Sequence, residues 1–241
     1  SARFADKLIV LNEADRSFAV ARRCKRETDS HVVRHGVSDR FLSAPPAIRE
    51  RGGGLLFCGS WDEVKGVSHL AQAFSRLVRS GARINLTILG GGLSEEAIRS
   101  RFPSEAQAYL TVRARATEDE VMRQYQRHDA LVFPSTYEGF GMVVVEAMSQ
   151  LLPVVATSVG CAAALVKDRE TGILVPPRDP AALALAADRL MKDPSLRSRL
   201  AENALAAVRD MSWRRTALET LDIYLAAKRA CPTAGAIGQR S

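Results

Sequence analysis

The chain has 241 residues, of which 46 % are hydrophobic and 25 % charged, and its formal net charge is +7. These values are ordinary for a globular protein, and they exclude a disordered chain, a collagen-like repeat and a small disulfide scaffold. No segment approaches the ~18 uninterrupted apolar residues of a membrane-spanning helix, and the first residues lack the apolar core of a signal peptide. The chain does not begin with Met, so we expect a processed or truncated protein.

The cysteines and histidines do not form metal-ligand patterns, so we predict no structural metal. The four cysteines form no Cys-x-x-Cys pair, and this pattern also favours a reducing, cytoplasmic location. The basic excess leaves three partner classes open: nucleic acid, an anionic membrane surface, or a small substrate that carries phosphate. Aromatic residues make up only 6 % of the chain and no nucleic-acid-reading motif is present, so we predict no nucleic-acid partner. Peripheral contact with a membrane remains open.

The first part of the chain predicts a short strand at 7–11, a helix at 13–25 and a second strand at 31–34. Paired prolines at 45–46 and three glycines at 52–54 then interrupt the pattern, as linkers do. We therefore predict a first domain segment at 1–36 and a linker at 37–53.

From residue 54 onward, short apolar runs alternate regularly with helical patterns. The strands are expected at 55–58, 84–89, 109–113, 130–133, 153–157 and 172–175. The intervening helices have recognisable starts, among them the capping box Thr117 to Glu120 and the cap Asp179 followed by Pro180. This alternation predicts an α/β fold with a parallel, Rossmann-like sheet flanked by helices, in a domain at 54–211. A last helix is expected at 212–228, and a disordered tail at 229–241.

Parallel sheets of this kind bind ligands at the carboxyl ends of their strands. Lys65 lies in the turn between the first strand of this domain and its helix, where a lysine can reach an anion. An exposed loop lysine is the alternative interpretation. The turn at 90–92 is glycine-rich, but it lacks the spacing of a dinucleotide-binding loop and is better explained as a tight turn.

The segment 134–148 carries the strongest functional pattern. Glu138 lies in a loop after a buried strand, two glycines follow, and Glu146 falls within the next, mostly apolar helix. The amino end of that helix suits a diphosphate, and a carboxylate deeper in a cleft can accept hydrogen bonds from a ribose diol. Because glutamate is rarely buried without a partner, a purely structural role for Glu146 is disfavoured.

The two glutamates, the Glu-Gly-Phe-Gly sequence at 138–141 and the Glu-Ala-Met sequence at 146–148 resemble the donor-site motif of retaining glycosyltransferases with the GT-B fold. The resemblance is to the group 1, family 4 type, mainly to its C-terminal, donor-binding domain, and it covers about 55–225. The Lys-Gly turn at 65–66 and the strands around 86–92, 129–135, 153–157 and 171–176 agree with it. Residues 1–36 resemble the end of that family's N-terminal, acceptor-side domain, to which the helix at 212–228 would return.

The resemblance implies a metal-independent transferase that moves a sugar, with retention, from a UDP- or GDP-linked donor to a sugar, lipid-linked or small-molecule acceptor. The nucleotide sugar is then a substrate, and no cofactor is implied. The resemblance assigns catalysis to Lys65, which would neutralise the diphosphate, and to Glu138, which would contact the transferred sugar. It gives the ribose to Glu146, and the remaining nucleotide contacts to Gly59, Val112, Arg113, Phe140, Gly141 and Met142.

The sequence departs from the family pattern in three places. Ser60 and Trp61 stand where an arginine usually follows the first glycine, and Cys161, Ala163 and Ala164 replace a usual glycine and Pro-Glu pair. Most of an acceptor-side domain is also absent from the 241 residues. The alternative to an enzyme is therefore a module that binds a nucleotide sugar without transferring it, and we expect little or no transfer by this chain alone.

Overall fold

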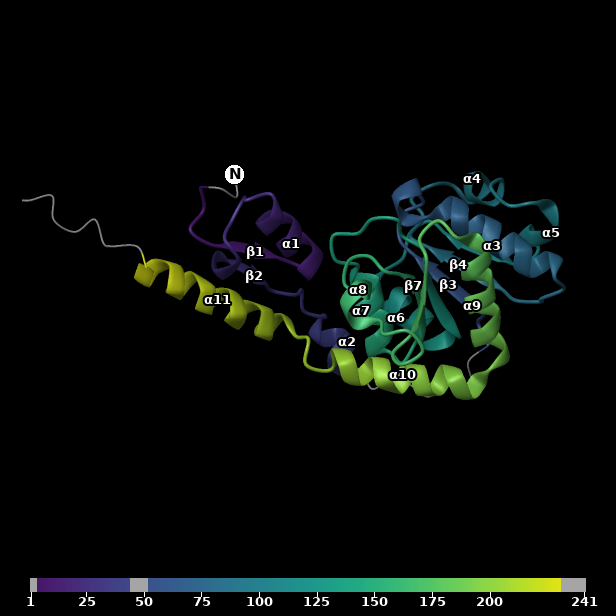
Figure 1. The fold of residues 1–241 in the computed structure, drawn as a ribbon. Helices are drawn as coiled ribbons and strands as arrows, with labels where there is room; N and C mark the ends of the chain where they lie inside the picture. The colour runs from purple at the N-terminus through teal and green to yellow at the C-terminus, as the bar shows by residue number, and fades with distance from the viewer. Residues whose placement is uncertain (1–3, 44–51, 231–241) are drawn as a thin grey trace, which may run out of the picture. The chain divides into compact units, whose positions relative to one another are not determined.

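The computed structural model describes residues 4–43 and 52–230 (Figure 1). The chain divides into two compact units, of which the first combines residues 1–36 with 211–241 and the second consists of residues 37–210. Residues 44–51, part of the expected linker, and residues 231–241, most of the expected tail, lie outside the described residues.

The first unit contains a parallel pair of strands, β1 (Leu8–Val10) and β2 (Ser30–Val32), joined through α1 (Glu13–Ala21) and the 3-10 turn η1 (Glu27–Asp29). The long helix α11 (Trp213–Ala230) belongs to the same unit, and its Thr216 hydroxyl donates a hydrogen bond to the Arg34 carbonyl. Gly36 lets the two segments approach closely, because a Cβ there would lie 2.1 Å from the Trp213 nitrogen.

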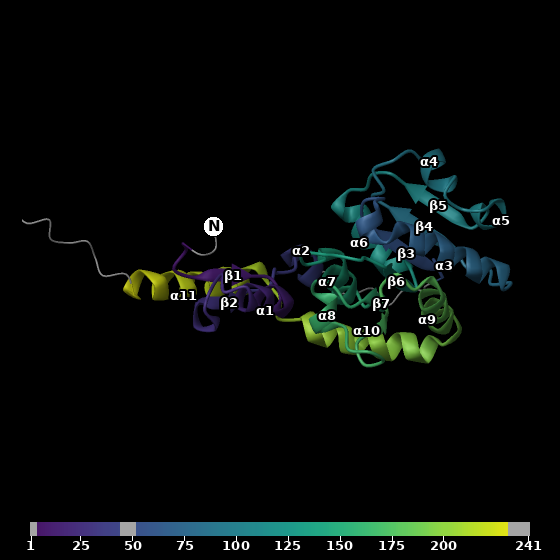
Figure 2. The same ribbon diagram turned by 45° about the horizontal axis from the view of Figure 1, so that its top comes forward.

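The second unit is built on a six-stranded, fully parallel sheet with the order β5-β4-β3-β6-β7-β8 (Figure 2). Its strands are β3 (Leu55–Cys58), β4 (Leu86–Leu89), β5 (Leu110–Arg113), β6 (Ala130–Phe133), β7 (Val154–Thr157) and β8 (Ile173–Val175). β4, β6 and β7 are buried at every position, as expected for a sheet covered on both faces. The predicted parallel α/β fold is therefore confirmed.

Most of the helices of the second unit connect consecutive strands. They are α2 (Asp39–Ser43), η2 (Glu63–Lys65), α3 (Val67–Arg79), α4 (Glu95–Arg99), α5 (Ser104–Gln107), α6 (Glu118–Arg127), α7 (Met142–Ser149), α8 (Ala162–Leu165), α9 (Pro180–Lys192) and α10 (Pro194–Val208). α3 packs against α9 and α10 packs against α7. The helices of each pair lie near one another in Figures 1 and 2.

The predicted helix starts of α6 and α9 are confirmed. Thr117 and Glu120 form the capping box of α6, and the Asp179 carboxylate accepts hydrogen bonds from the first turn of α9. The short helices α2, α5 and α8 are not predicted by the sequence, because four or five residues are too few to show a helical period. α2 falls within the stretch expected to be linker, and its Phe41 side chain is buried in the second unit.

Candidate functional site

The strand order places the candidate functional site between β3 and β6. The chain runs from β3 outward to β4 and β5, and then returns to add β6, β7 and β8 on the other side of β3. At such a switch point the loops after the two neighbouring strands diverge, and the crevice between them is where open α/β sheets bind ligands. Lys65 follows β3 and Glu138 follows β6, so both predicted catalytic residues lie at this point.

The turn after β3 is held by a capping carboxylate and a left-handed glycine. Asp62 accepts hydrogen bonds from the backbone N–H groups of Val64 and Lys65, which begins η2. Gly66 then adopts φ +72° and begins α3, and a Cβ at Gly66 would lie 2.0 Å from the Pro134 carbonyl oxygen. The turn after β3 is therefore pressed against the loop after β6, which fixes where Lys65 projects.

Lys65 and Glu138 form an ion pair. The Lys65 Nζ donates to Glu138 Oε2 at 2.6 Å, and the two side chains are 28 % and 14 % exposed. The structure thus joins two residues that are 73 positions apart in the sequence and that were predicted to share one site. Each remains partly accessible, so a phosphate group or a sugar hydroxyl could replace one partner of the pair.

The loop at 138–141 leads into the amino end of α7. Gly141 adopts φ +92°, and no side chain caps the helix. The first N–H groups of a helix lack intrahelical partners and carry a positive partial charge, which suits a phosphate. The Phe140 side chain is buried, and its carbonyl accepts a hydrogen bond from the Cys161 N–H at 2.6 Å. The loop that contains Cys161 therefore supports this turn, although it lacks the family's usual residues.

Glu146 lies in the second turn of α7 and is half-buried. Its Oε2 accepts a hydrogen bond of 3.0 Å from the hydroxyl of Tyr125, a fully buried residue of α6. Burial raises the pKa of the Glu146 carboxyl; the Tyr125 hydrogen bond opposes this rise and the nearby charge of Glu118 adds to it. The Glu146 carboxylate is thus partly desolvated and held by a neutral donor rather than by a cation.

Cys58 locates this pair of side chains relative to the sheet. It is the last residue of β3, and its thiol interacts with Tyr125 and with the charge of Glu146. Burial is the main cause that raises the pKa of the Cys58 thiol to about 11, and burial also raises the pKa of Tyr125 well above its ordinary value. Because Cys58 marks the carboxyl end of β3, Glu146 lies next to the same crevice as Lys65 and Glu138.

Three other predicted nucleotide contacts lie at the carboxyl ends of their strands, Gly59 after β3 and Val112 and Arg113 at the end of β5. The Gly59 N–H donates to the Leu89 carbonyl, which ties the loop after β3 to β4. The Val112 side chain is buried in the hydrophobic core, whereas Arg113 is exposed at the end of β5. The structure therefore places these three residues at the carboxyl end of the sheet, where the crevice lies. Among the described residues, none of the three forms a hydrogen bond with Lys65 or Glu138.

Ser60 and Trp61 stand where the family usually has an arginine, and they support a turn and pack in the core. The Ser60 hydroxyl donates to the Asp62 carboxylate, so it supports the turn after β3. Trp61 is 8 % exposed and packs edge-on against Phe57 and next to Phe102. Neither residue supplies a positive charge to the crevice, which leaves Lys65 as the cation of this turn.

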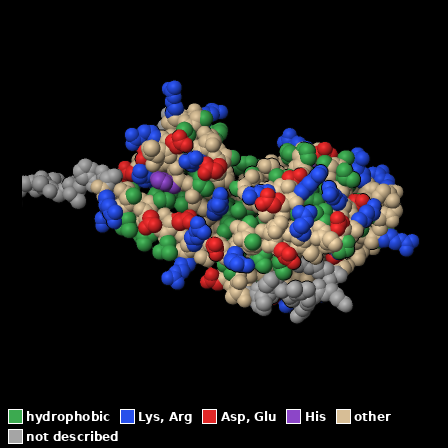
Figure 3. Space-filling view, turned by 60° about the horizontal axis from the view of Figure 1, so that its bottom comes forward, with side chains coloured by type: hydrophobic (Ala, Val, Ile, Leu, Met, Phe, Trp, Pro, Cys, Tyr) green, Lys and Arg blue, Asp and Glu red, His purple; other side chains and the backbone are tan. Residues whose placement is uncertain are grey.

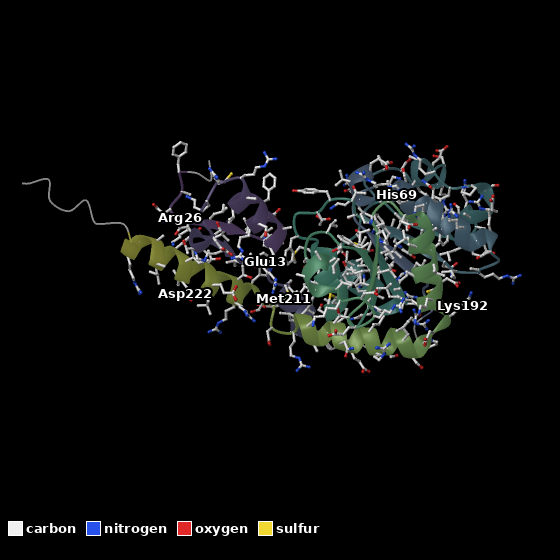
Figure 4. All side chains as sticks on the ribbon, viewed as in Figure 1. Glu13, Arg26, His69, Lys192, Met211 and Asp222 are labelled. Carbon is white, nitrogen blue, oxygen red and sulfur yellow. The ribbon has the colours of Figure 1, made fainter. Side chains whose placement is uncertain are left out.

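Two residues near the crevice are missed by the sequence analysis. The capping box at 117–120 predicts only that Tyr125 lies on a helix, although a buried hydroxyl generally requires a hydrogen-bond partner. His69, labelled on α3 in Figure 4, lines a small pocket together with Pro134, Thr157 and Arg178, which follow or end β6, β7 and β8. A histidine one turn after the Lys-Gly turn could have been noticed from its spacing alone.

A larger pocket of about 580 Å³ lies outside the crevice, and its lining includes Asp62, Ser68, Gln72, Arg79 and Arg101. Neither Lys65 nor either of the two predicted glutamates lines it. Within 4–43 and 52–230, no three His, Cys, Asp or Glu side chains gather as a metal site requires. In the same ranges, no helix is both long and apolar enough to cross a bilayer.

The geometry defines a parallel α/β domain with a crevice between β3 and β6, and comparison with known proteins identifies its family. Residues 38–206 match the family described as glycosyl transferases group 1. The chain is 32 % identical over 207 residues to a glycogen synthase of Mycobacterium tuberculosis, covering 82 % of this chain and 49 % of that protein. It is 33 % identical over 184 residues to a D-inositol 3-phosphate glycosyltransferase of Streptomyces bingchenggensis, covering 72 % of this chain and 40 % of that protein.

Solved structures agree on the fold. A glycosyltransferase from Rickettsia africae superposes with a TM-score of 0.80 at 18 % identity, over 94 % of this chain and 64 % of that one. Anabaena Alr3699/HepE in complex with UDP superposes with a TM-score of 0.78 at 20 % identity, over 93 % of this chain and 65 % of that one. The chain belongs to the group 1 glycosyltransferase family, and it spans about half the length of the curated relatives it matches.

Proposed function

We propose that the protein is a glycosyltransferase that moves a sugar from a nucleotide-sugar donor to an acceptor, and that residues 37–210 bind the donor. The observation that carries this proposal is the meeting of Lys65 and Glu138 at the switch point between β3 and β6. A cation and an uncapped helix start suit the diphosphate of a nucleotide sugar, and two carboxylates suit its hydroxyl groups. They lie on the loops after two adjacent strands and on the helix that follows the second.

The proposed chemistry follows from the charge that develops when the sugar leaves. The departing nucleoside diphosphate gains negative charge, and preorganised positive groups lower the energy of that transition state. Lys65 and the first N–H groups of α7 would supply this stabilisation, and Glu138 would orient the transferred sugar through its hydroxyl groups. In this proposal no metal ion is needed, because the lysine and the helix start neutralise the diphosphate. Retention of the anomeric configuration is proposed from the family resemblance.

The donor and acceptor are proposed at the level of class. Three similar structures are complexes that contain UDP, those of HepE, TarM and the pneumococcal transferase GtfA, so UDP is the first nucleotide to test. GDP is the second, as the family resemblance implies. The two relatives described above carry names that differ in acceptor, so we propose only a sugar, lipid-linked or small-molecule acceptor.

Calorimetric titration with UDP, GDP and ADP, in EDTA and in Mg²⁺, tests the donor site directly. We expect one nucleotide to bind with equal affinity in both buffers, and binding that requires Mg²⁺ would refute the metal-free proposal. Glu146→Gln should weaken binding by about 1–3 kcal/mol, the usual value for a charge-assisted hydrogen bond. Glu202→Gln, the same change at an exposed position of α10, is the matched control.

Transfer itself is tested with a radiolabelled nucleotide sugar and mixed acceptors, followed by NMR of the product's anomeric proton. An α-linked product from an α-linked donor supports retention, and a β-linked product refutes it. Binding without any product would favour the module that holds a nucleotide sugar without transferring it. If none of the three nucleotides binds, the donor-site proposal is wrong.

Nucleic-acid binding remains the less favoured proposal. On the face drawn in Figure 3, Lys and Arg side chains are interspersed with Asp and Glu rather than gathered in one stripe. Several of the basic residues are paired within the protein, including Lys7 with Asp29 and Lys192 with Asp188. DNA affinity that falls steeply as salt rises would support nucleic-acid binding against this expectation.

A further inference from the structure

Tyr125 connects three elements around Glu146. Its side chain is fully buried in α6, and its ring lies 5.9 Å from that of Phe41 in α2. Its hydroxyl donates to Glu146 Oε2 and interacts with the Cys58 thiol at the end of β3. A phenylalanine would fill almost the same space without a buried hydroxyl to satisfy, so packing alone does not account for a tyrosine here.

We propose that Tyr125 is a positioning residue, which holds the Glu146 carboxylate so that its second oxygen faces the ribose hydroxyl groups of the bound nucleotide. This inference rests on the proposed function, because it assumes that Glu146 contacts the ribose. It concerns a residue on a different helix, which does not itself touch the nucleotide.

The hydrogen bond leaves one carboxylate oxygen for the ligand. Oε2 is occupied by Tyr125, whereas Oε1 has no hydrogen-bond partner among the described residues and is not fully enclosed. A free glutamate side chain samples several rotamers, and the entropy of fixing them would otherwise be lost when the nucleotide binds. The Tyr125 bond fixes the carboxylate in advance, so the ribose meets an acceptor that is already oriented.

The same hydrogen bond also favours the charged form of Glu146. Burial and the charge of Glu118 raise the pKa of Glu146, and the Tyr125 hydroxyl is the group that opposes them. Cys58 also faces the carboxylate, but burial keeps its thiol neutral by raising its pKa to about 11. Removal of the hydroxyl should therefore raise the pKa of Glu146 further, and a protonated carboxyl is a weaker acceptor for two ribose hydroxyl groups.

Tyr125→Phe is the variant that tests this role, because it removes only the hydroxyl. Wild-type protein and variant are titrated with UDP, GDP or ADP, whichever binds best, and with the 2′,3′-dideoxy form of that nucleotide. We expect the variant to bind the ribonucleotide roughly 5- to 50-fold more weakly, within the range of one charge-assisted hydrogen bond, and to bind the dideoxynucleotide as the wild type does. The acid limb of the affinity against pH should also move to higher pH.

Tyr109→Phe provides the matched control. Tyr109 is partly buried and immediately precedes β5. It therefore lies at the amino end of its strand, whereas the crevice lies at the carboxyl ends of β3 and β6. This variant should keep both the ribonucleotide affinity and the preference for ribose. A general effect of removing a tyrosine hydroxyl would appear in both variants.

The outcomes separate this inference from the proposed function. If the wild-type protein binds none of the three nucleotides, the proposed function fails and this inference fails with it. If the wild type prefers ribose and Tyr125→Phe keeps that preference and the same pH profile, only the inference is refuted. Should Tyr125→Phe unfold more easily, it is compared with Glu146→Gln and the double variant. If the losses of nucleotide affinity in the two single variants do not add in the double variant, the positioning role is supported. If they add, it is contradicted.

Discussion

Gly66→Ala tests whether the turn that carries Lys65 is fixed by its contact with the loop after β6. Two effects of the substitution can be separated. Alanine at φ +72° costs about 1–2 kcal/mol, because its Cβ crowds the backbone in the left-handed region. The Cβ would also lie 2.0 Å from the oxygen and 2.7 Å from the carbon of the Pro134 carbonyl. Relieving that overlap requires a backbone shift, for which overpacking data suggest about 1–3 kcal/mol more.

Gly81→Ala isolates the conformational effect. Gly81 has φ +89°, and no heavy atom lies within 4 Å of the position that a Cβ would take there, so the overlap with a neighbour is absent. Thermal unfolding followed by the fluorescence of Trp61, in a Trp213→Phe background, reports on the second unit alone. Each kcal/mol should lower Tm by roughly 2–4 °C in a domain of this size. We expect Gly66→Ala to melt well below Gly81→Ala and to bind nucleotide more weakly. Equal melting temperatures would show that the contact with the Pro134 carbonyl does not constrain the turn that carries Lys65.

Three further predictions concern charged side chains. Glu138→Gln should strengthen the binding of UDP several-fold in calorimetry, because the diphosphate would no longer compete with Glu138 for Lys65; unchanged affinity would contradict this exchange. The stability contributed by Glu146 should be fullest below about pH 4.5 and be lost as pH rises through its raised pKa, since the folded state binds that proton more tightly. Urea unfolding across pH should show this decline, and Glu146→Gln should remove it. Asp179→Ala should cost about 0.5–2 kcal/mol in the same assay, because the first turn of α9 loses its cap; no loss would show that the cap is dispensable.

The sheet could be predicted well from the sequence because local signals agree with the global fold. Buried parallel strands appear as continuous apolar runs, and the helices between them begin with capping residues such as Thr117 and Asp179. The sequence could also place Lys65 and Glu138 after strands. It could not show that these strands are neighbours, because the order β5-β4-β3-β6-β7-β8 depends on long-range packing. Their contact at 2.6 Å is therefore information that only the structure supplies.

The contact between Tyr125 and Glu146 shows the same limit in another form. The sequence indicates that Glu146 needs a partner, because it lies within an apolar helix. The partner, Tyr125, lies 21 residues away on α6, the helix that precedes β6. The helix that carries this tyrosine is predicted from its capping box, but the direction of the tyrosine hydroxyl depends on how α6 and α7 pack. Periodicity identifies the buried face of a helix without identifying what that face meets.

The two glutamates of this segment have different partners, and this difference has consequences for how a donor could bind. Glu138 is paired with the Lys65 cation, so in the proposed complex a diphosphate must replace the carboxylate, which then becomes free to meet the sugar. Glu146 is held by the neutral Tyr125 hydroxyl and has a second oxygen for the ribose, so no ion pair has to break at that end. In the proposed complex, the ribose end of the site would therefore be formed in advance, whereas the diphosphate end would be completed by an exchange of partners. Because that exchange would free Glu138 only when phosphate engages Lys65, we propose that the sugar contact is linked to the presence of the diphosphate.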